Sequence, residues 1–267
     1  MSCPVCGHDR VFVRYTIGAY NLECCRRCGH AVTEPMPEPA ELAALYDQRY
    51  FAAHYEDVAP GDPGFGKHIC REDHRINFVK KYKTRGRLLD VGCGRGYFLY
   101  GCQKRFVPVG FDISPANKDF ITRKLGLEFV DNPGEISQRR FDVITFWHSF
   151  EHFPDPERQL AFFTDLLAED GIVIVDVPNH DSIDAFMEGE DWPGWDLPFH
   201  CHHFTPNSLA LVIKRHGLEI IGQKTYHCGY IKRRLAKNPI TRPFARPIAK
   251  LFPGSSILFA CRKKEQR

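Results

Sequence analysis

A glycine turn at residues 92–96, with glycine at every second position, constrains the fold of this chain more than any other feature. The apolar residues Leu88, Leu89 and Val91 predict a buried strand before the turn, and residues 97–99 predict the start of a helix after it. Glycine lets the main chain approach a ligand closely, and the following helix aims its N-terminus at that ligand. Segment 87–99 therefore predicts a strand–turn–helix unit that binds a cofactor.

Two residues distinguish between the cofactor classes that use such a turn. In the dinucleotide pattern G-x-G-x-x-G/A, the last small residue lets the helix pack on the strand, whereas here that position is Tyr97. Asp90 ends the predicted strand, where a carboxylate repels a pyrophosphate but attracts an ammonium group. S-adenosylmethionine (SAM) carries such a group on its aminobutyrate end. Both residues favour SAM and disfavour a nicotinamide oxidoreductase, which stays an alternative.

The segment Leu89–Gly96 resembles the first motif of the class I SAM-dependent methyltransferases, and two later segments extend the resemblance. Segment 107–114 looks like the second strand of that family, with Asp112 placed against both ribose hydroxyls of the cofactor. Segment 141–153 is similar to the fourth strand and its following loop. The cofactor-binding residues that the resemblance implies are Asp90, Gly92, Cys93, Gly94, Gly96, Tyr97, Phe98, Asp112, Ile113, Asp131, Asn132, Trp147 and His148.

The order of strand and helix patterns predicts an α/β fold. The expected strands are 87–92, 107–113, 127–131, 142–148, 171–178, 218–226 and 256–262, and the expected helices are 96–106, 114–125, 155–169 and 206–216. Such alternation indicates a Rossmann-like, seven-stranded, mostly parallel and doubly wound sheet. Ligands bind at the carboxyl ends of the strands in these sheets, where the glycine turn, Asp112, Asp131 and segment 147–152 fall. Whether Asp131 or Asn132 meets the adenine amino group stays open, as does a plain turn there.

A histidine-rich segment after the fourth strand supplies candidate catalytic residues. His148 and His152 titrate near neutrality and are candidate general bases, and Glu151 could orient one of them. The alternative is that this segment only caps the strand beneath the cofactor.

The long connection at about 179–205 supplies a further candidate base, His200. Long loops inside compact domains are often functional, and Trp192, Trp195 and the histidines suit a substrate wall. The segment 197–206 resembles a string found in one branch of bacterial methyltransferases, and the matching residues are Leu197, Pro198, His200, His203, Phe204, Thr205 and Pro206. This resemblance implies an acceptor from sugar or cell-surface metabolism. A second metal site or structural histidines are the alternatives.

The first 32 residues predict a zinc ribbon. Two C-x-x-C pairs, each followed by glycine, place Cys3, Cys6, Cys25 and Cys28 at a spacing that suits a structural Zn²⁺ site. Cys24 could replace Cys25, but it breaks the C-x-x-C spacing. An unmetallated thiol cluster or an interaction module is the alternative.

Composition narrows the remaining possibilities. With 267 residues and 43% hydrophobic residues, the chain can bury a large core, and a net charge of +3 gives weak support for nucleic-acid binding. Eleven cysteines without an export signal favour a cytoplasmic protein with reduced thiols, and no apolar run predicts a transmembrane segment.

We expect three regions: a zinc ribbon at 1–32, a linker and helical lead-in at 33–84, and a SAM-binding domain at 85–267. The aromatic residues Tyr50, Phe51 and Tyr55 either form a lid or pack the ribbon onto the domain. The basic stretch 231–250 has no acidic residue and reads as a solvated face, with binding to a phosphate-bearing substrate or an anionic membrane as alternatives.

The sequence as a whole predicts a methyltransferase that moves the methyl group of SAM to a small-molecule acceptor, such as a sugar or nucleotide-linked sugar. A nucleic-acid methyltransferase is disfavoured, because the fourth strand is followed by Trp147–Phe150 and not by a motif that grips a flipped base. A non-catalytic SAM-binding protein that interacts through its ribbon stays an alternative. The acceptor atom and the oligomeric state do not follow from the sequence.

Overall fold

The computed structural model describes residues 2–45 and 56–264. Tyr50, Phe51 and Tyr55, the candidate lid residues, lie outside the described residues. In the described part of the chain, no helix is long and apolar enough to cross a membrane.

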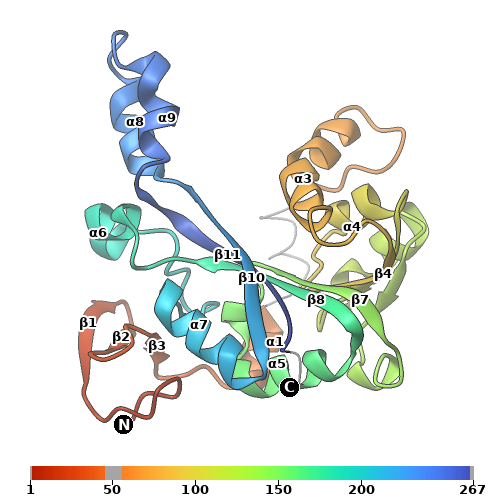
Figure 1. Ribbon diagram of the computed structural model, residues 1–267, viewed down its shortest axis with the longest axis horizontal. Coiled ribbons are helices and arrows are strands. Elements are labelled where there is room, and N and C mark those ends of the chain that lie inside the picture. Colours follow the sequence, from red (N-terminus) through yellow and green to blue (C-terminus); the bar gives the residue numbers. More distant parts are fainter. Residues whose placement is uncertain (1, 46–55, 265–267) are drawn as a thin grey trace. The chain divides into compact units, whose positions relative to one another are not determined.

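Seven strands form the larger sheet in the order β10-β11-β8-β7-β4-β5-β6 (Figure 1). Their bounds are β4 (Gly86–Val91), β5 (Phe106–Phe111), β6 (Glu128–Val130), β7 (Phe141–Trp147), β8 (Leu167–Pro178), β10 (Leu218–His227) and β11 (Pro253–Lys263). Strand β4 pairs in parallel with β5 and β7, and β5 pairs in parallel with β6. The predicted Rossmann-like sheet is confirmed. Its strand order changes direction at β4, and ligands of such sheets bind at the carboxyl edge of that point.

The helices agree with the sequence where their caps are strong. Helix α7 (Pro206–Arg215) begins with a capping box in which the Thr205 side chain accepts from the Ser208 N–H, with Pro206 at the first position. The other helices along the sheet strands are α3 (Phe65–Val79), α4 (Tyr97–Cys102) and α5 (Pro156–Asp165), and α1 (Pro39–Leu45) precedes them.

The helix expected over 96–106 ends at Cys102, and two further predicted helices are wrong in type or length. The helix expected over 114–125 is a 3-10 turn at Pro115–Asn117 followed by a π-helix at Phe120–Lys124, because the Leu125 N–H donates to the Phe120 carbonyl five residues earlier. The helix expected over 155–169 ends at Asp165, because the Leu166 carbonyl already accepts the Phe141 N–H as β8 begins.

The chain divides into two compact units. The glycine-turn unit comprises residues 39–45, 56–147, 160–174 and 262–264 of the described chain. The ribbon unit comprises residues 2–38, 148–159 and 175–261. The ribbon thus groups with segments far along the sequence, and domain boundaries drawn after residues 32 and 84 stay predictions.

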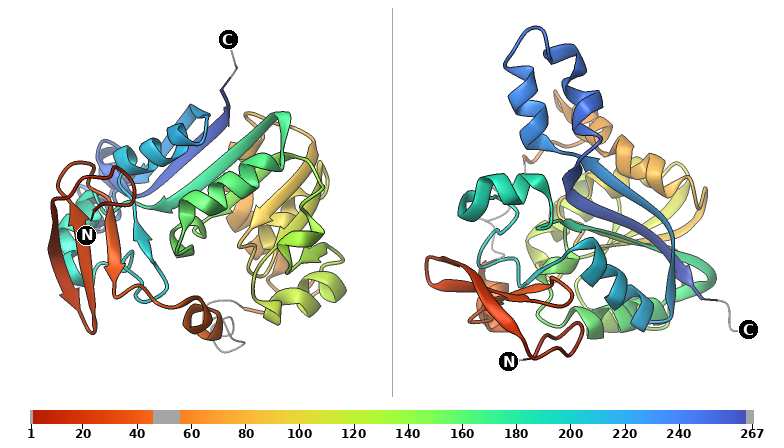
Figure 2. Two further views of the ribbon diagram at one scale, coloured as in Figure 1. Left: turned by 90° about the horizontal axis from the view of Figure 1, so that it is seen from below. Right: turned by 60° about the vertical axis from the view of Figure 1, so that its left-hand side comes forward.

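A second, four-stranded sheet in the ribbon unit has the order β1-β2-β3-β9 (Figure 2). It consists of β1 (Val11–Ile17), β2 (Tyr20–Cys25), β3 (Ala31–Glu34) and β9 (His202–His203). Leu22 of β2 packs in one apolar cluster with Trp192 and Trp195, which are 3% and 2% exposed. The two tryptophans are therefore core residues of the ribbon unit, and the expectation that they form a substrate wall is wrong.

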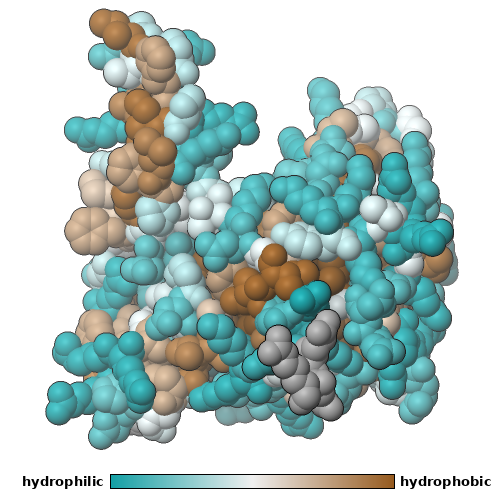
Figure 3. Space-filling model, viewed as in Figure 1, coloured by the Kyte–Doolittle hydropathy of each residue, from teal (hydrophilic) through white to brown (hydrophobic). Residues whose placement is uncertain are grey.

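A helical hairpin joins β10 to β11 in the ribbon unit. Helix α8 (Gly229–Ala236) packs against α9 (Ala245–Ala249) and against α6 (Ile183–Glu188). Figure 3 shows apolar side chains along this hairpin with hydrophilic side chains on both sides of them. Exposed apolar residues at this position are unusual, because large apolar side chains of a folded domain normally lie in its core.

Candidate functional site

The glycine turn links β4 to α4 through three residues with left-handed backbone conformation. The φ angles of Gly92, Gly94 and Gly96 are +74°, +50° and +73°, a region that residues with a Cβ atom rarely adopt. The Gly92 N–H donates to the Phe111 carbonyl at 2.8 Å, which ties the turn to the end of β5. The predicted strand–turn–helix unit therefore lies at the carboxyl edge of the sheet.

Asp112 follows β5 and holds the glycine turn in place. Its two carboxylate oxygens accept hydrogen bonds from the Gly94 N–H at 3.2 Å and the Ser114 N–H at 3.0 Å. Burial raises the pKa of Asp112 to about 6, although the two N–H donors act in the opposite direction. Near neutral pH the ionised carboxylate is available to hydroxyl donors of a ligand.

Asp90 lies deeper, at the end of β4, and is 3% exposed. Its Oδ1 atom accepts the Thr145 hydroxyl of β7 at 2.6 Å. Burial raises the pKa of Asp90 to about 7, against the Thr145 hydrogen bond and the Arg75 charge, which lower it. A nearby cation would lower this pKa further, because it favours the charged form of the carboxyl group.

Aromatic residues of the predicted cofactor set lie against one another. Trp147, at the end of β7, makes an edge contact with Phe98 with ring centroids 5.4 Å apart. The Arg75 guanidinium lies over the indole at 5.2 Å.

Cys93 is buried, and its Sγ lies so close to Gly110 that a Cβ atom on residue 110 would approach it to 2.8 Å. Ile113, in contrast, exposes 54% of its surface directly after Asp112.

Asp131 and Asn132 follow β6 and differ in their partners. Asp131 forms an ion pair with Lys118 at 3.0 Å. The Asn132 side chain accepts the Gly134 N–H at 2.9 Å and caps the next 3-10 turn. The side-chain oxygen of Asn132 is therefore already engaged in a local turn.

Tyr97 and Arg95 anchor the segment that precedes α3, and the sequence did not single out Arg95. The Tyr97 hydroxyl donates to the Glu56 carbonyl at 2.5 Å and accepts the Val58 N–H at 3.0 Å. Arg95 forms an ion pair with Asp57 at 2.7 Å. Segment 56–58 is thus held on the residues that border the glycine turn.

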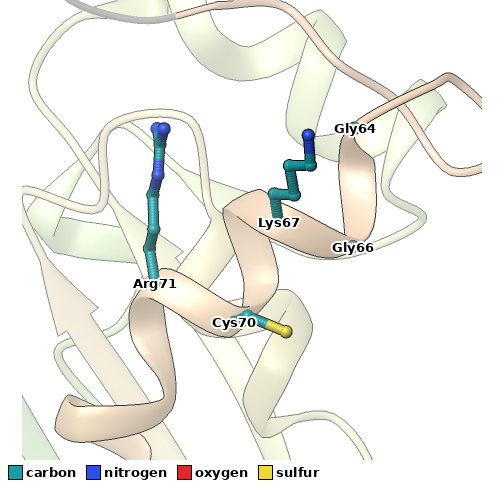
Figure 4. A pocket seen from close by; sticks show the side chains of 5 residues that line it. All are labelled: Gly64, Gly66, Lys67, Cys70 and Arg71. Carbon is teal, nitrogen blue, oxygen red and sulfur yellow. The ribbon is translucent and has the colours of Figure 1, made fainter.

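A separate hollow of about 540 Å³ lies along α3 in the same unit (Figure 4). Its lining consists of Gly64, Gly66, Lys67, Cys70 and Arg71. Figure 4 shows the Lys67 and Arg71 side chains pointing to the same side of the helix. None of the residues predicted to bind the cofactor lines this hollow.

In the ribbon unit, His148 stands between two carboxylates. Its backbone is left-handed, with φ of +53°, and its N–H donates to the Asp176 carbonyl at 2.8 Å. The Nδ1 atom lies 3.5 Å from Glu151 Oε1, and the Nε2 atom lies 3.9 Å from Asp176 Oδ1. The imidazole is 41% exposed, so a ligand from solution can reach it.

Glu151, His152 and His200 form a cluster next to His148, in which Glu151 and His200 are buried and His152 is partly exposed. Their ligand atoms all lie within 4.8 Å of one another. Burial acts to raise the pKa of Glu151, but the neighbouring histidines outweigh it and lower that pKa to about 2. Burial lowers the pKa of His152 to about 4 and lowers that of His200, so at neutral pH the carboxylate is charged and both rings are neutral.

The other histidines of the 200–203 run connect this loop to the ribbon. His202 Nδ1 lies 2.9 Å from His30 Nε2, and His203 Nε2 lies 2.9 Å from the Thr33 hydroxyl. The Thr33 hydroxyl also donates to the His200 carbonyl at 2.7 Å. Of this run, only His200 faces Glu151, and the others hold β9 on β3.

The four predicted metal-ligating cysteines come together in the ribbon. The Sγ atoms of Cys3 and Cys28 are 3.6 Å apart, and those of Cys6 and Cys25 are 3.5 Å apart. A tetrahedral zinc site with Zn–S bonds of about 2.3 Å needs sulfurs roughly 3.8 Å apart, so the donor set fits zinc. Cys24 is not a member of this group, in agreement with the C-x-x-C spacing.

Comparison with known proteins identifies the family. A family model for a methyltransferase domain matches residues 67–223. The tRNA U34 carboxymethyltransferase of Sulfurimonas denitrificans is 31% identical over 147 residues, covering 48% of this chain and 46% of that protein. The ubiquinone biosynthesis O-methyltransferase of Neisseria meningitidis serogroup C is 26% identical over 175 residues, covering 57% of this chain and 74% of that protein.

Solved structures support the fold. The magnesium protoporphyrin IX methyltransferase from Synechocystis, solved with bound S-adenosylhomocysteine (SAH), superimposes with a TM-score of 0.60. The match covers 85% of this chain and 100% of that chain at 11% identity, a likeness of fold alone. Because the family model covers more than half of the sequence and the strand order agrees with this fold, the chain belongs to the methyltransferase-domain family, whose cofactor is SAM.

Proposed function

We propose that this protein transfers the methyl group of SAM to a small-molecule acceptor, with sugars and nucleotide-linked sugars as the first class to test. The observation that carries the proposal is the position of Asp90, the glycine turn and Asp112 on neighbouring strand ends, where the strand order changes direction. The exposed imidazole of His148, one residue after β7, supports chemistry on an acceptor and not cofactor binding alone.

Each part of the cofactor has a matching group in the glycine-turn unit. Asp112 accepts the ribose hydroxyls, and the backbone of residues 92–96 approaches the aminobutyrate end, whose ammonium group interacts with Asp90. Ile113 offers an exposed apolar surface beside Asp112 for the adenine ring. Asp131 is the better partner for the adenine amino group, because the Asn132 oxygen already caps a turn.

His148 is the general base of this proposal. In the reaction the acceptor atom forms a bond to the methyl carbon, the carbon–sulfur bond breaks, its electron pair stays on sulfur, and the acceptor proton passes to the imidazole. His152 and His200 are less suitable, because burial lowers the pKa of His152 to about 4 and only 8% of the His200 side chain is exposed. They remain members of the site behind His148, together with Glu151.

The ribbon binds one structural Zn²⁺ ion through Cys3, Cys6, Cys25 and Cys28 in this proposal. The four sulfurs supply a complete tetrahedral set and leave no open position for a substrate. The ribbon then serves to position β9 and the residues next to it.

We expect the substitution C25S to abolish stoichiometric zinc binding, whereas the neighbouring C24S retains it, because Cys24 lies outside the four-sulfur group. The measurement is metal content by mass spectrometry after gel filtration, with thermal unfolding beside it. Loss of zinc should lower the melting temperature of C25S, because metal binding to the native state stabilises it. Equal zinc content in the two variants would contradict the assignment.

We expect SAH binding to weaken as the pH falls, because the ribose hydroxyls donate to the ionised form of Asp112, whose pKa is about 6. Affinity should be constant above the pKa and fall by up to about tenfold per pH unit below it. D112N should lose roughly ten- to hundredfold in affinity at neutral pH, the range for hydrogen bonds to a charged group. Calorimetric titration at several pH values measures both effects.

The exposed residue Asp119 supplies the control, because D119N changes the same chemical group away from the turn. A pH dependence near 7 that persists in D112N would belong to Asp90, whose pKa is about 7. Unchanged affinity and an unchanged pH profile in D112N would contradict the placement of the ribose.

We expect H148Q to lower kcat by about 10²- to 10⁴-fold, the usual contribution of a positioned general base, with SAH affinity unchanged. The measurement is SAH formation with a panel of sugars, nucleotide sugars, phenols and amines. H216Q is the matched control, since His216 follows α7 in the same unit and lies outside the cluster. Full activity in H148Q would show that His148 is not the general base. Tight SAH binding without turnover of any acceptor would favour the non-catalytic alternative.

A further inference from the structure

Glu151, His152 and His200 have a second property that the proposed base does not use. All three lie in the ribbon unit, and each offers one ligand atom within 4.8 Å of the other two. The rings of His152 and His200 meet edge to face, with centroids 4.6 Å apart and an interplanar angle of 83°. Two imidazoles and one carboxylate in such proximity are a donor set for a divalent transition-metal ion.

The two rings are oriented by backbone carbonyls. His152 Nδ1 lies 3.1 Å from the Phe199 carbonyl oxygen, and His200 Nδ1 lies 2.9 Å from that of Gly194. A carbonyl oxygen only accepts, so in each ring Nδ1 carries the hydrogen and Nε2 carries the lone pair. Metal-binding histidines show this arrangement, because a second hydrogen bond fixes the tautomer and the ring orientation.

The carboxylate of Glu151 supplies the independent observation. Its side chain is 1% exposed, and neither Oε atom accepts a hydrogen bond from the described residues. The basic atoms His148 Nδ1 and His200 Nε2 lie 3.5 Å and 3.8 Å from Oε1, both beyond good hydrogen-bond distance. A carboxylate that is buried without close donors carries a desolvation cost, which the nearby imidazoles offset and a bound cation would offset further.

We propose that Glu151, His152 and His200 bind one divalent transition-metal ion, separate from the four-cysteine site. Asp196 borders the group, with Oδ2 3.6 Å from His200 Nε2, and is placed to add a further oxygen ligand. Imidazole and carboxylate ligands suit Zn²⁺, Co²⁺ and Fe²⁺. This proposal does not depend on His148 being a base, because metal binding is measured without turnover.

The test uses the full chain with zinc already bound to the ribbon, titrated with Co²⁺. We expect one Co²⁺ per chain in addition to the ribbon zinc, with visible absorption bands but without thiolate charge-transfer bands. E151Q and H200N should each lower the Co²⁺ affinity by at least about tenfold, while H216N binds it like the unaltered protein. Thermal unfolding and retained ribbon zinc show that each variant is folded.

The outcomes separate the proposals. Absence of Co²⁺ uptake beyond the ribbon, or unchanged uptake in a folded E151Q or H200N, would overturn the metal site and leave the cofactor proposal intact. If E151Q does not fold, H152Q and H200N decide the same question. Thiolate charge-transfer bands would place the ion on cysteines and would also overturn the site.

The hairpin α8–α9 carries a second inference from different residues. Ile240 and Leu251 are each 80% exposed, Phe244 is 60% exposed and Ile248 is 36% exposed. On the neighbouring helix α6, Phe186 is 74% exposed. Figure 3 shows apolar side chains as a continuous strip along the hairpin rather than as scattered positions.

Charge surrounds this strip on the same hairpin. The basic residues are Lys232, Arg233, Arg234, Lys237, Arg242, Arg246 and Lys250, and all are exposed. No acidic residue occurs between positions 220 and 264. On this hairpin the apolar strip is flanked only by cations. Such a surface is complementary to the interface of an anionic bilayer, where anionic head groups lie above apolar acyl chains.

We infer that the α8–α9 hairpin docks on an anionic membrane surface. Sedimentation with vesicles made of equal parts phosphatidylcholine and phosphatidylglycerol tests this, with phosphatidylcholine vesicles beside them. We expect binding to the anionic vesicles only, weakened by salt. The double variants I240S/L251S and K237Q/R242Q should each lose at least about tenfold in binding. V107S is the matched control, since Val107 is 60% exposed on β5.

Other occupants give different results. Absence of sedimentation with anionic vesicles, or equal binding by I240S/L251S, would overturn the membrane surface. Self-association in analytical ultracentrifugation that disappears in I240S/L251S, without vesicle binding, would assign the strip to a second copy of the chain. Because these side chains are exposed, the substitutions should leave thermal unfolding unchanged, which checks the variants.

Discussion

The position of His200 depends on a small set of hydrogen bonds between the ribbon and a loop far along the chain. Thr33 of β3 donates to the His200 carbonyl, and strand β9 pairs with β3 directly after that residue. The apolar cluster of Leu22, Trp192 and Trp195 belongs to the same connection. A metal bound by the four cysteines would therefore stabilise more than a terminal module. It would fix the strand to which the histidine-rich loop is attached.

The proposed binding of the cofactor depends on a different constraint, the contact of Asp112 with the glycine turn. A carboxylate that accepts main-chain N–H groups before any ligand arrives already has its position set by the fold. Ligand hydroxyls would then donate to a carboxylate that is already oriented, so little entropy is lost in ordering that carboxylate. Burial raises the pKa of both Asp112 and Asp90, so in our proposal cofactor binding is sensitive to pH near neutrality.

Sequence reasoning reached the sheet, the glycine turn and the four-sulfur group because each depends on local spacing. It missed Arg75, Thr145 and Asp176, whose roles arise only from contacts across many residues, such as Thr145 with Asp90. It also assigned Trp192 and Trp195 to a substrate wall, because periodicity does not tell a buried aromatic residue from a ligand-facing one. The prediction of an α-helix over 114–125 was wrong, because the cap at Ser114 indicates only where a helix starts. It does not determine which hydrogen bonds the following residues form.

The related proteins share a fold, but their names give different acceptors, so membership of the family does not specify the acceptor of this chain. The ribbon and the α8–α9 hairpin lie outside residues 67–223, the range that the family model matches, whereas the loop that carries His200 lies within it. In our proposal methyl transfer uses one accessible base, His148, whereas the cluster behind it holds an ionised carboxylate and two oriented imidazoles. The proposed cation would offset part of the cost of burying that carboxylate. We therefore propose that the histidine-rich loop serves the acceptor and that the glycine turn serves the cofactor.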